Sequence, residues 1–132
     1  MSEPESERSK KSRVIAEIEA GLEEIARNDV VSHEEMKRRS EAGAEQITWT
    51  RRASIQLENA QNSFAQDAPF AADPFVDRVL ELVEELRRYS DIGRVIPEYE
   101  NPRFRERVFG RYRIMYAVEE GGVRILAVFQ DG

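Results

Sequence analysis

The sequence lacks most of the residues that carry enzyme chemistry. Its 132 residues include no cysteine and a single histidine, His33. Without cysteine the chain has neither disulfides nor thiolate chemistry, which fits a reducing cytoplasm. No catalytic partner lies near His33 in the sequence, so we expect it at the surface in the first turn of a helix. No group of residues has the spacing of metal ligands. We therefore expect no metal and no cofactor.

Long apolar runs are also missing. No stretch approaches the roughly 20 apolar residues that a membrane span requires. Residues 1–11 are polar and charged, without the apolar centre of a signal peptide, and we expect a disordered tail there. These absences favour a cytoplasmic chain with no membrane partner.

Charge is present but unevenly spread. Residues 1–46 carry eight Lys and Arg against twelve Asp and Glu, whereas residues 94–113 carry six Arg against three Glu. An acidic first part and a basic later part attract each other or compete for an anionic partner. Two separately solvated faces are the alternative.

The first part predicts a helical segment over residues 12–40. Its apolar residues recur at helical spacing and need a surface to cover. We expect this interface to consist of Val14, Ile15, Ile18, Leu22, Ile25, Val30, Val31 and Met36. The helix stops at Asn28-Asp29, and a second, polar helix runs from Ser32 to Ser40, opened by a capping box. Residues 41–46 are small and polar, which indicates a linker.

Residues 47–132 predict a separate α+β domain. A strand from Gln46 to Arg51 is followed by two amphipathic helices on either side of Pro69. Three strands end the chain, the last two joined by a Glu-Glu-Gly-Gly turn. The expected fold is a small antiparallel sheet built from a strand, a helical hairpin and a three-stranded meander. The last strand is apolar on both faces, so we expect the N-terminal helix to pack on the face that the hairpin leaves open.

The order of these pieces resembles the ParE/RelE toxin superfamily over residues 46–130. The most specific motifs are Ile92-Gly93-Arg94 with Pro97-Glu98-Tyr99, and Tyr112-Arg113-Ile114-Met115-Tyr116. The first part is similar to the toxin-wrapping end of ParD-like antitoxins, through Gly21-Leu22-Glu23-Glu24-Ile25 and Val30-Val31-Ser32-His33-Glu34-Glu35. Glu24 and Asn28 stand where that family often has Asp and Gly.

Together the two resemblances imply an antitoxin tail and its toxin in one chain. The tail then neutralises the toxin in cis, or is exchanged between two chains in a dimer. Its apolar stripe covers the toxin, and its acidic residues screen the toxin arginines. The short linker raises the effective concentration of the tail to the millimolar range.

The superfamily resemblance implies one of two activities. ParE-like members are associated with poisoning DNA gyrase, and RelE-like members cut mRNA on the ribosome. Arg105, Arg107 and Arg113 are the candidates for stabilising a phosphate transition state if the chain is a ribonuclease. We expect target contacts at Arg94, Arg103, Arg111 and Tyr112.

We favour gyrase inhibition, which makes the chain a non-enzymatic toxin. The basic C-terminal residues of the ribonucleases are missing, since the chain ends in Phe129-Gln130-Asp131-Gly132, and the helical hairpin is long. An mRNA endoribonuclease and an inactive interaction module, with its arginines paired to nearby acids, are the alternatives.

Overall fold

A computed structural model describes residues 5–27, 30–32 and 46–130. The chain forms helices and strands in the following order: α1 (Glu5–Ala26), β1 (Val30–Ser32), β2 (Gln46–Thr50), α3 (Arg51–Asp67), α4 (Pro69–Glu84), the short 3-10 helix η1 (Glu85–Arg87), β3 (Arg94–Val95), β4 (Phe104–Phe109), β5 (Tyr112–Glu119) and β6 (Gly122–Gln130).

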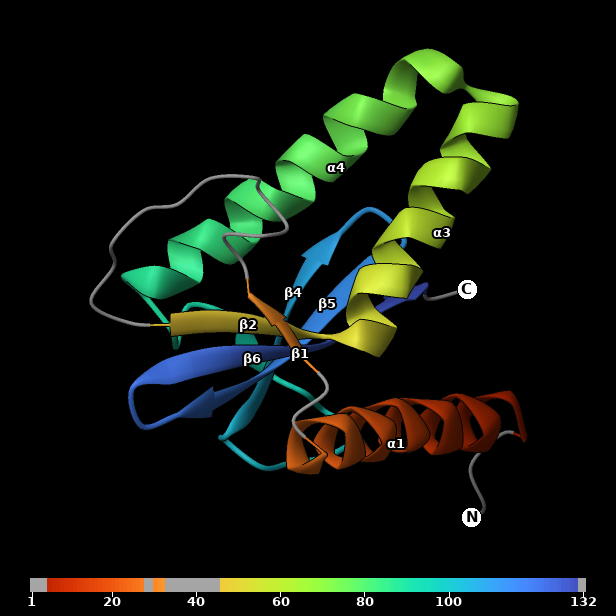
Figure 1. The fold of residues 1–132 in the computed structure, drawn as a ribbon. Coiled ribbons are helices and arrows are strands. Elements are labelled where there is room, and N and C mark those ends of the chain that lie inside the picture. Colours follow the sequence, from red (N-terminus) through yellow and green to blue (C-terminus); the bar gives the residue numbers. More distant parts are fainter. Residues whose placement is uncertain (1–4, 28–29, 33–45, 131–132) are drawn as a thin grey trace.

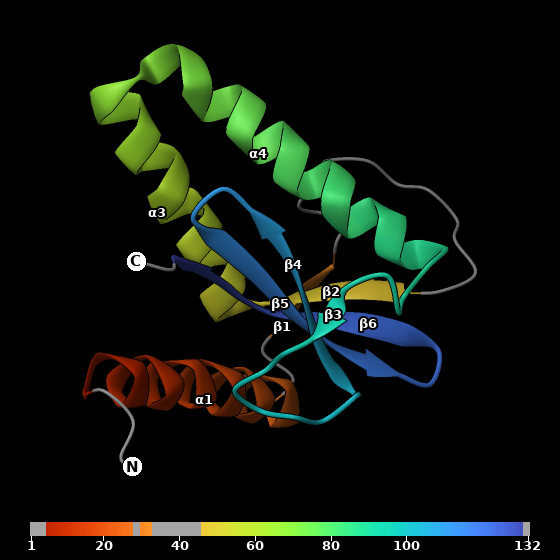
Figure 2. The same cartoon turned by 180° about the vertical axis from the view of Figure 1, so that it is seen from behind.

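The described strands form one six-stranded sheet in the order β1-β2-β6-β5-β4-β3. The α3–α4 hairpin covers one face of the sheet, and α1 lies across the other face (Figure 1). Figure 2 shows the same three layers from behind. This confirms the predicted α+β fold with its helical hairpin, its meander and its N-terminal helix packed on the sheet. The sheet is mixed rather than purely antiparallel, because β2 runs parallel to β6.

Helix α1 is longer than predicted. It begins at Glu5 rather than Ser12, so residues 5–11 are helical and not a disordered tail. The added stretch reads Glu-Ser-Glu-Arg-Ser-Lys-Lys, with acidic residues before basic ones. This order suits the helix dipole, and Arg and Lys are good helix formers. The stretch lacks apolar periodicity, which is why the sequence pattern did not include it.

The apolar pair after α1 forms a strand. Val30–Ser32 pairs antiparallel with β2, with Val31 opposite Trp49. The predicted helical segment over residues 12–40 is therefore interrupted by a strand, because β-branched valines at an open sheet edge favour strand pairing. The extended backbone of Ser32 is compatible with its predicted place as the N-cap of a second helix. The rest of that predicted helix, with His33 and Met36, and the predicted linker up to residue 45 lie outside the described residues.

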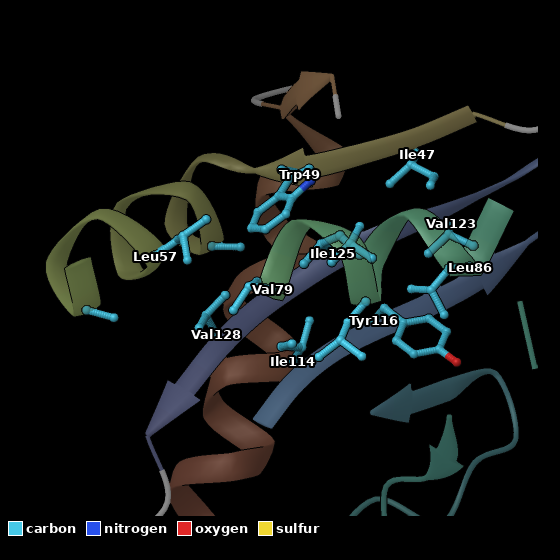
Figure 3. Close-up of a cluster of buried hydrophobic side chains, with 14 of the residues drawn as sticks. Ile47, Trp49, Leu57, Val79, Leu86, Ile114, Tyr116, Val123, Ile125 and Val128 are labelled. Atoms are coloured by element: carbon cyan, nitrogen blue, oxygen red, sulfur yellow. The ribbon is translucent and has the colours of Figure 1, made fainter. Parts of the chain in front are cut away.

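Two apolar cores lie on opposite faces of the sheet. The hairpin core, between the sheet and α3–α4, is centred on Trp49, Tyr116 and Ile125 (Figure 3). The α1 core lies between α1 and the sheet. Its buried members are Val14, Ile18, Ile96, Phe104, Met115, Ala117, Leu126, Ala127 and Phe129.

A bulge in β6 lets this strand serve both cores. The pairing with β5 shifts between Met115 opposite Ala127 and Tyr116 opposite Ile125, which leaves Leu126 as the extra residue. Leu126, Ala127 and Phe129 therefore all belong to the α1 core. Strict alternation, which would place Ala127 and Phe129 on the face of Ile125, is wrong at this point because a bulge adds one residue to one strand.

Candidate functional site: the α1 docking face and the adjoining cleft

The apolar stripe of α1 is docked on the sheet. Val14 and Ile18 are fully buried in the α1 core, and Leu22 and Ile25 pack against it half-buried. Ile15 is half-buried beside them. Five of the predicted interface residues therefore lie on the docked helix. Val30 and Val31 belong to β1, and Met36 lies outside the described residues.

Polar contacts fix the same helix to the start of α3. The carboxylate of Glu17 accepts bonds from Arg52 Nε at 2.8 Å and from the Gln56 side-chain amide at 2.9 Å. Burial works to raise the pKa of Glu17, but the hydrogen bonds and the charge of Arg52 lower it below its ordinary 4.5. Glu24 accepts a bond from the backbone N–H of Arg52 at 2.9 Å.

Arg113 lies at the centre of a buried ion network on the α1 face. Its guanidinium donates to Glu98 at 2.7 and 3.0 Å and to Glu106, and Arg94 reaches the other oxygen of Glu106 at 2.6 Å. Glu106 is fully buried and the Arg113 side chain is 3% exposed. Burial opposes the charge of Arg113, yet bonds to the two carboxylates raise its pKa above the ordinary value. The hydrogen bonds from Arg113 are the largest cause that lowers the pKa of Glu98.

The three arginines predicted as ribonuclease candidates are not brought together. Arg105 and Arg107 pair with Tyr116 and Ile114 of the hairpin core, whereas Arg113 pairs with Phe129 of the α1 core. The first two therefore lie on the opposite sheet face from Arg113.

The chain's own groups hold the two arginines on the hairpin face. Arg105 donates to backbone carbonyls, including Gly93 O at 2.9 Å. Arg107 donates to Glu85 at 2.6 Å. The resemblance implied that acids of the first part screen the toxin arginines. Among the described residues this holds for Arg52, which pairs with Glu17 of α1, whereas the ion pairs of the sheet arginines are made with other acids. These other acids lie within residues 85–119.

Two of the predicted target-contact residues meet at a cleft. Arg111 and Tyr112 line a space of about 670 Å³ between the tip of the α3–α4 hairpin and the β4–β5 turn. Arg94 and Arg103 lie elsewhere and pair with Glu106 and Glu119. We call the space lined by Arg111 and Tyr112 the tip cleft. The residues that line it are Ser63, Phe64, Asp67, Ala68, Ala71, Pro74, Phe75, Phe109, Gly110, Arg111, Tyr112 and Gln130.

The wall of the tip cleft is aromatic. Phe75 contacts the rings of Phe64, Tyr112 and Phe109 at centroid distances of 4.7, 4.9 and 5.8 Å. Phe70, next in sequence to the lining residue Ala71, is 84% exposed. An exposed aromatic beside an aromatic cleft is typical of a protein-binding surface.

A smaller groove joins the tip cleft to α1. It has a volume of about 260 Å³ and shares Ser63, Tyr112 and Gln130 with the cleft. Its other end is bounded by Gln56 and by Glu17 of α1. Helix α1 therefore closes one end of a continuous depression along α3.

The sequence did not point to Arg52 or Gln56, whereas Glu106 was expected as a partner of the arginines in the interaction-module alternative and does pair with Arg94 and Arg113. Arg52 and Gln56 are spaced four residues apart, which places them on one side of α3, and this was the signal available for them. Within the described parts of the chain, no group of three or more acidic or histidine side chains is placed to hold a metal ion. None of the described helices is long and apolar enough to cross a membrane.

The fold has a solved counterpart among toxin–antitoxin proteins. A chain of the structure titled "Chromosomal ParDE TA system from P. aeruginosa" superimposes with a TM-score of 0.58 at 20% sequence identity, covering 69% of this chain and all of that one. The family model described as the ParE toxin of the type II toxin-antitoxin system parDE matches residues 47–131. The chain therefore belongs to the ParE toxin family. A search of curated proteins finds no match.

Proposed function

We propose that the chain is a ParE-type toxin that carries its own neutralising segment, residues 5–32, and that its target is DNA gyrase in the cytoplasm. The observation that carries the proposal is that α1 and β1 lie outside the family match and yet are built onto the sheet of the matched domain. Helix α1 lays its apolar stripe on an open face, and β1 adds a strand to the edge of β2. Both are recurring modes by which peptides are recognised.

The neutralising effect follows from what α1 occupies. Burying Val14 and Ile18 contributes on the order of 3–6 kcal/mol in favour of the docked state. In that state Glu17 closes the groove that leads from the tip cleft. Release of α1 would expose the apolar sheet face and open the groove up to Arg52. We propose that a gyrase segment binds along this depression, with Arg111 and Tyr112 at its far end.

The arrangement of arginines supports a non-enzymatic action over RNA cleavage. A ribonuclease of this kind needs cationic groups directed at one phosphate. Here Arg113 is buried between two carboxylates, and Arg105 and Arg107 are held on the opposite face. The proposed activity therefore requires a protein partner rather than a phosphate site on the sheet.

The masking part of the proposal is tested with Ile18→Asp in the full chain. A carboxylate at this fully buried position should undock α1. We expect the variant to arrest bacterial growth and to inhibit gyrase supercoiling of plasmid DNA in vitro. Ala16→Asp is the matched control, because it introduces the same group on the exposed side of α1. Equal growth with both variants would reject masking by α1.

The target is tested with the same purified variant. Incubation with translating ribosomes should leave mRNA intact, and site-specific cuts would reject the gyrase proposal in favour of the ribonuclease alternative. Adding Arg111→Glu to Ile18→Asp should abolish gyrase inhibition. Arg88→Glu, which reverses the charge of another exposed arginine away from the tip cleft, should not abolish it.

A further inference from the structure

Three residues on one face of α1 contact the toxin domain without burying an apolar side chain: two through carboxylate hydrogen bonds and one through close backbone approach. Glu17, Gly21 and Glu24 are spaced four and three residues apart, so they share one face of the helix. Glu17 and Glu24 reach the start of α3, and Gly21 faces β6. This face therefore carries the pattern Glu-x3-Gly-x2-Glu.

Arg52 holds both carboxylates at once. Its guanidinium donates to Glu17 through Nε at 2.8 Å and through a terminal nitrogen at 2.9 Å. Its backbone N–H, in the first turn of α3, donates to Glu24 at 2.9 Å. An N–H at this position has no partner within its own helix, so a carboxylate there is favoured both by the bond and by the helix dipole.

Gln56 fixes the position of the first carboxylate relative to the sheet. Its amide N–H donates to Glu17, and its side-chain oxygen accepts from the backbone N–H of Val128 at 2.8 Å. Glu17 thus accepts three hydrogen bonds while only 13% of its side chain is exposed. A helix without a carboxylate here would leave these donors unsatisfied.

Gly21 lets the helix approach the bulge in β6. A Cβ atom added at this position would lie 2.9 Å from Leu126 Cδ2 and 3.3 Å from Leu126 Cα. Part of that crowding involves backbone, which side-chain rotation does not relieve. A larger residue would therefore push the helix away from the sheet, and the two carboxylates with it.

We propose that Arg52, Gln56 and Leu126 form a receptor that selects α1 by this Glu-x3-Gly-x2-Glu pattern. Many amphipathic helices would cover the apolar sheet face, but few would match two carboxylates two turns apart with a glycine between them. The receptor supplies the specificity that apolar burial lacks. Its occupant is the α1 helix of this chain. The inference rests on the proposed role of α1 as the neutralising segment.

The test is hydrogen exchange of the α1 amides in the full chain, with β5 amides as the internal reference. Glu17→Arg and Arg52→Glu should each speed α1 exchange about 10- to 100-fold. The double variant, Glu17→Arg with Arg52→Glu, reverses the ion pair and should recover most of the loss. The β5 amides should keep their rates, because only α1 opens.

Two controls separate recognition from general damage. Glu19→Arg makes the same charge change at an exposed position of α1 and should leave exchange unchanged. Gly21→Val should speed α1 exchange, whereas Ala16→Val on the exposed side should not. Faster exchange of the β5 amides in Glu17→Arg would mean that this variant disturbs the whole fold. The milder variant Glu17→Gln is then used in its place, and we expect its α1 amides, but not its β5 amides, to exchange several-fold faster.

Two results would overturn the receptor. In the first, the α1 amides exchange no faster in Glu17→Arg than in Glu19→Arg, or no faster in Glu17→Gln where that variant is used instead. In the second, the α1 amides of the double variant exchange no more slowly than those of Arg52→Glu alone. Failure of the proposed function looks different. If α1 opens as expected in these variants but gyrase and growth are unaffected, the receptor stands and the toxin role is rejected.

Discussion

At the scale of single residues, the arginines of the sheet form ion pairs mainly with glutamates of the same domain. Arg113 shows this most clearly, because its two carboxylate partners neutralise it inside the molecule. Removing one member of such a network leaves the other charges buried without compensation, which costs more than the pair contributes.

The first prediction concerns Arg113→Met. We expect it to lower the free energy of unfolding by about 3–5 kcal/mol in urea denaturation, because Glu106 is fully buried and its remaining ion-pair partner among the described residues, Arg94, has a side chain that is 60% exposed. Arg111→Met, at an exposed site, should change it by less than about 0.5 kcal/mol. Adding Glu106→Leu to Arg113→Met should recover part of the loss. A cost under about 1 kcal/mol would contradict this account.

The second prediction concerns pH. The pKa of Glu17 is lower in the folded protein than its ordinary 4.5, so its contribution is present above that value and is lost as the pH falls through the folded pKa. The free energy of unfolding should therefore decline below about pH 4.5. Glu17→Gln should be less stable near neutral pH and should show a shallower decline in acid. Parallel curves for the two proteins, measured by urea denaturation, would exclude this role of Glu17.

At the scale of elements, Thr50 joins the hairpin side of the molecule to the α1 side. It ends β2 and caps α3, accepting a bond from the Ala53 N–H at 3.0 Å. The same fully buried hydroxyl donates to the carbonyl of Leu126 at 3.1 Å, at the bulge on which α1 rests. The hydroxyl of Thr50 thus hydrogen-bonds both a backbone N–H at the start of α3 and a backbone carbonyl at the bulge of β6.

The third prediction follows from this double bond. Thr50→Val keeps the shape but removes both hydrogen bonds, and it should lower the free energy of unfolding by about 2–3 kcal/mol. Thr50→Ser retains the hydroxyl and is the matched control, with a smaller loss. Thermal or urea unfolding of both variants measures the difference. A loss for Thr50→Val no greater than that for Thr50→Ser would contradict this account, because the two hydrogen bonds would then contribute no more than the methyl group.

The elements also mark how far the sequence predicts the fold. Helical and strand periodicity located α3, α4 and the meander, because each buries a regular apolar face. Periodicity did not predict the helical structure of residues 5–11 of α1, because these residues form no apolar stripe. It failed at β1, where pairing with a distant edge decides the conformation, and at Leu126, where a bulge breaks the alternation.

The site was less predictable than the fold, because it depends on contacts between residues that lie far apart in the sequence. Composition indicated that residues 94–113 are rich in arginine, but a residue's face and its partner depend on register. Arg105 and Arg113 differ in face because of strand pairing, and Glu98 reaches Arg113 from a loop. The spacing of Arg52 and Gln56 indicated a shared side of α3 but not its partner, since Glu17 lies 35 residues away from Arg52 in sequence.

At the scale of the whole molecule, the chain combines a family domain with a segment that completes it. The toxin family accounts for residues 47–131, and α1 with β1 supplies a third layer and an edge strand. Joining the two in one chain gives the segment an effective concentration on the order of millimolar. The proposed neutralisation in cis would therefore tolerate weaker contacts than an antitoxin acting as a separate chain.

The last prediction tests this tether. A protease site placed within residues 41–45 allows the chain to be cut while every contact of α1 and β1 is kept. After cutting, docking depends on total protein concentration, because the segment now dissociates into bulk solution. Size-exclusion chromatography should show the two pieces together at high concentration and separate on dilution, with gyrase inhibition appearing as they separate.

The uncut chain is the control for the tether. If α1 docks in cis, dilution should change neither its elution nor its activity. Dissociation of the uncut chain into smaller active species would instead mean that α1 is exchanged between two chains. Pieces that stay together at every dilution would show that the contacts of α1 and β1 suffice without covalent linkage. In that case the segment would neutralise the toxin equally well as a separate chain.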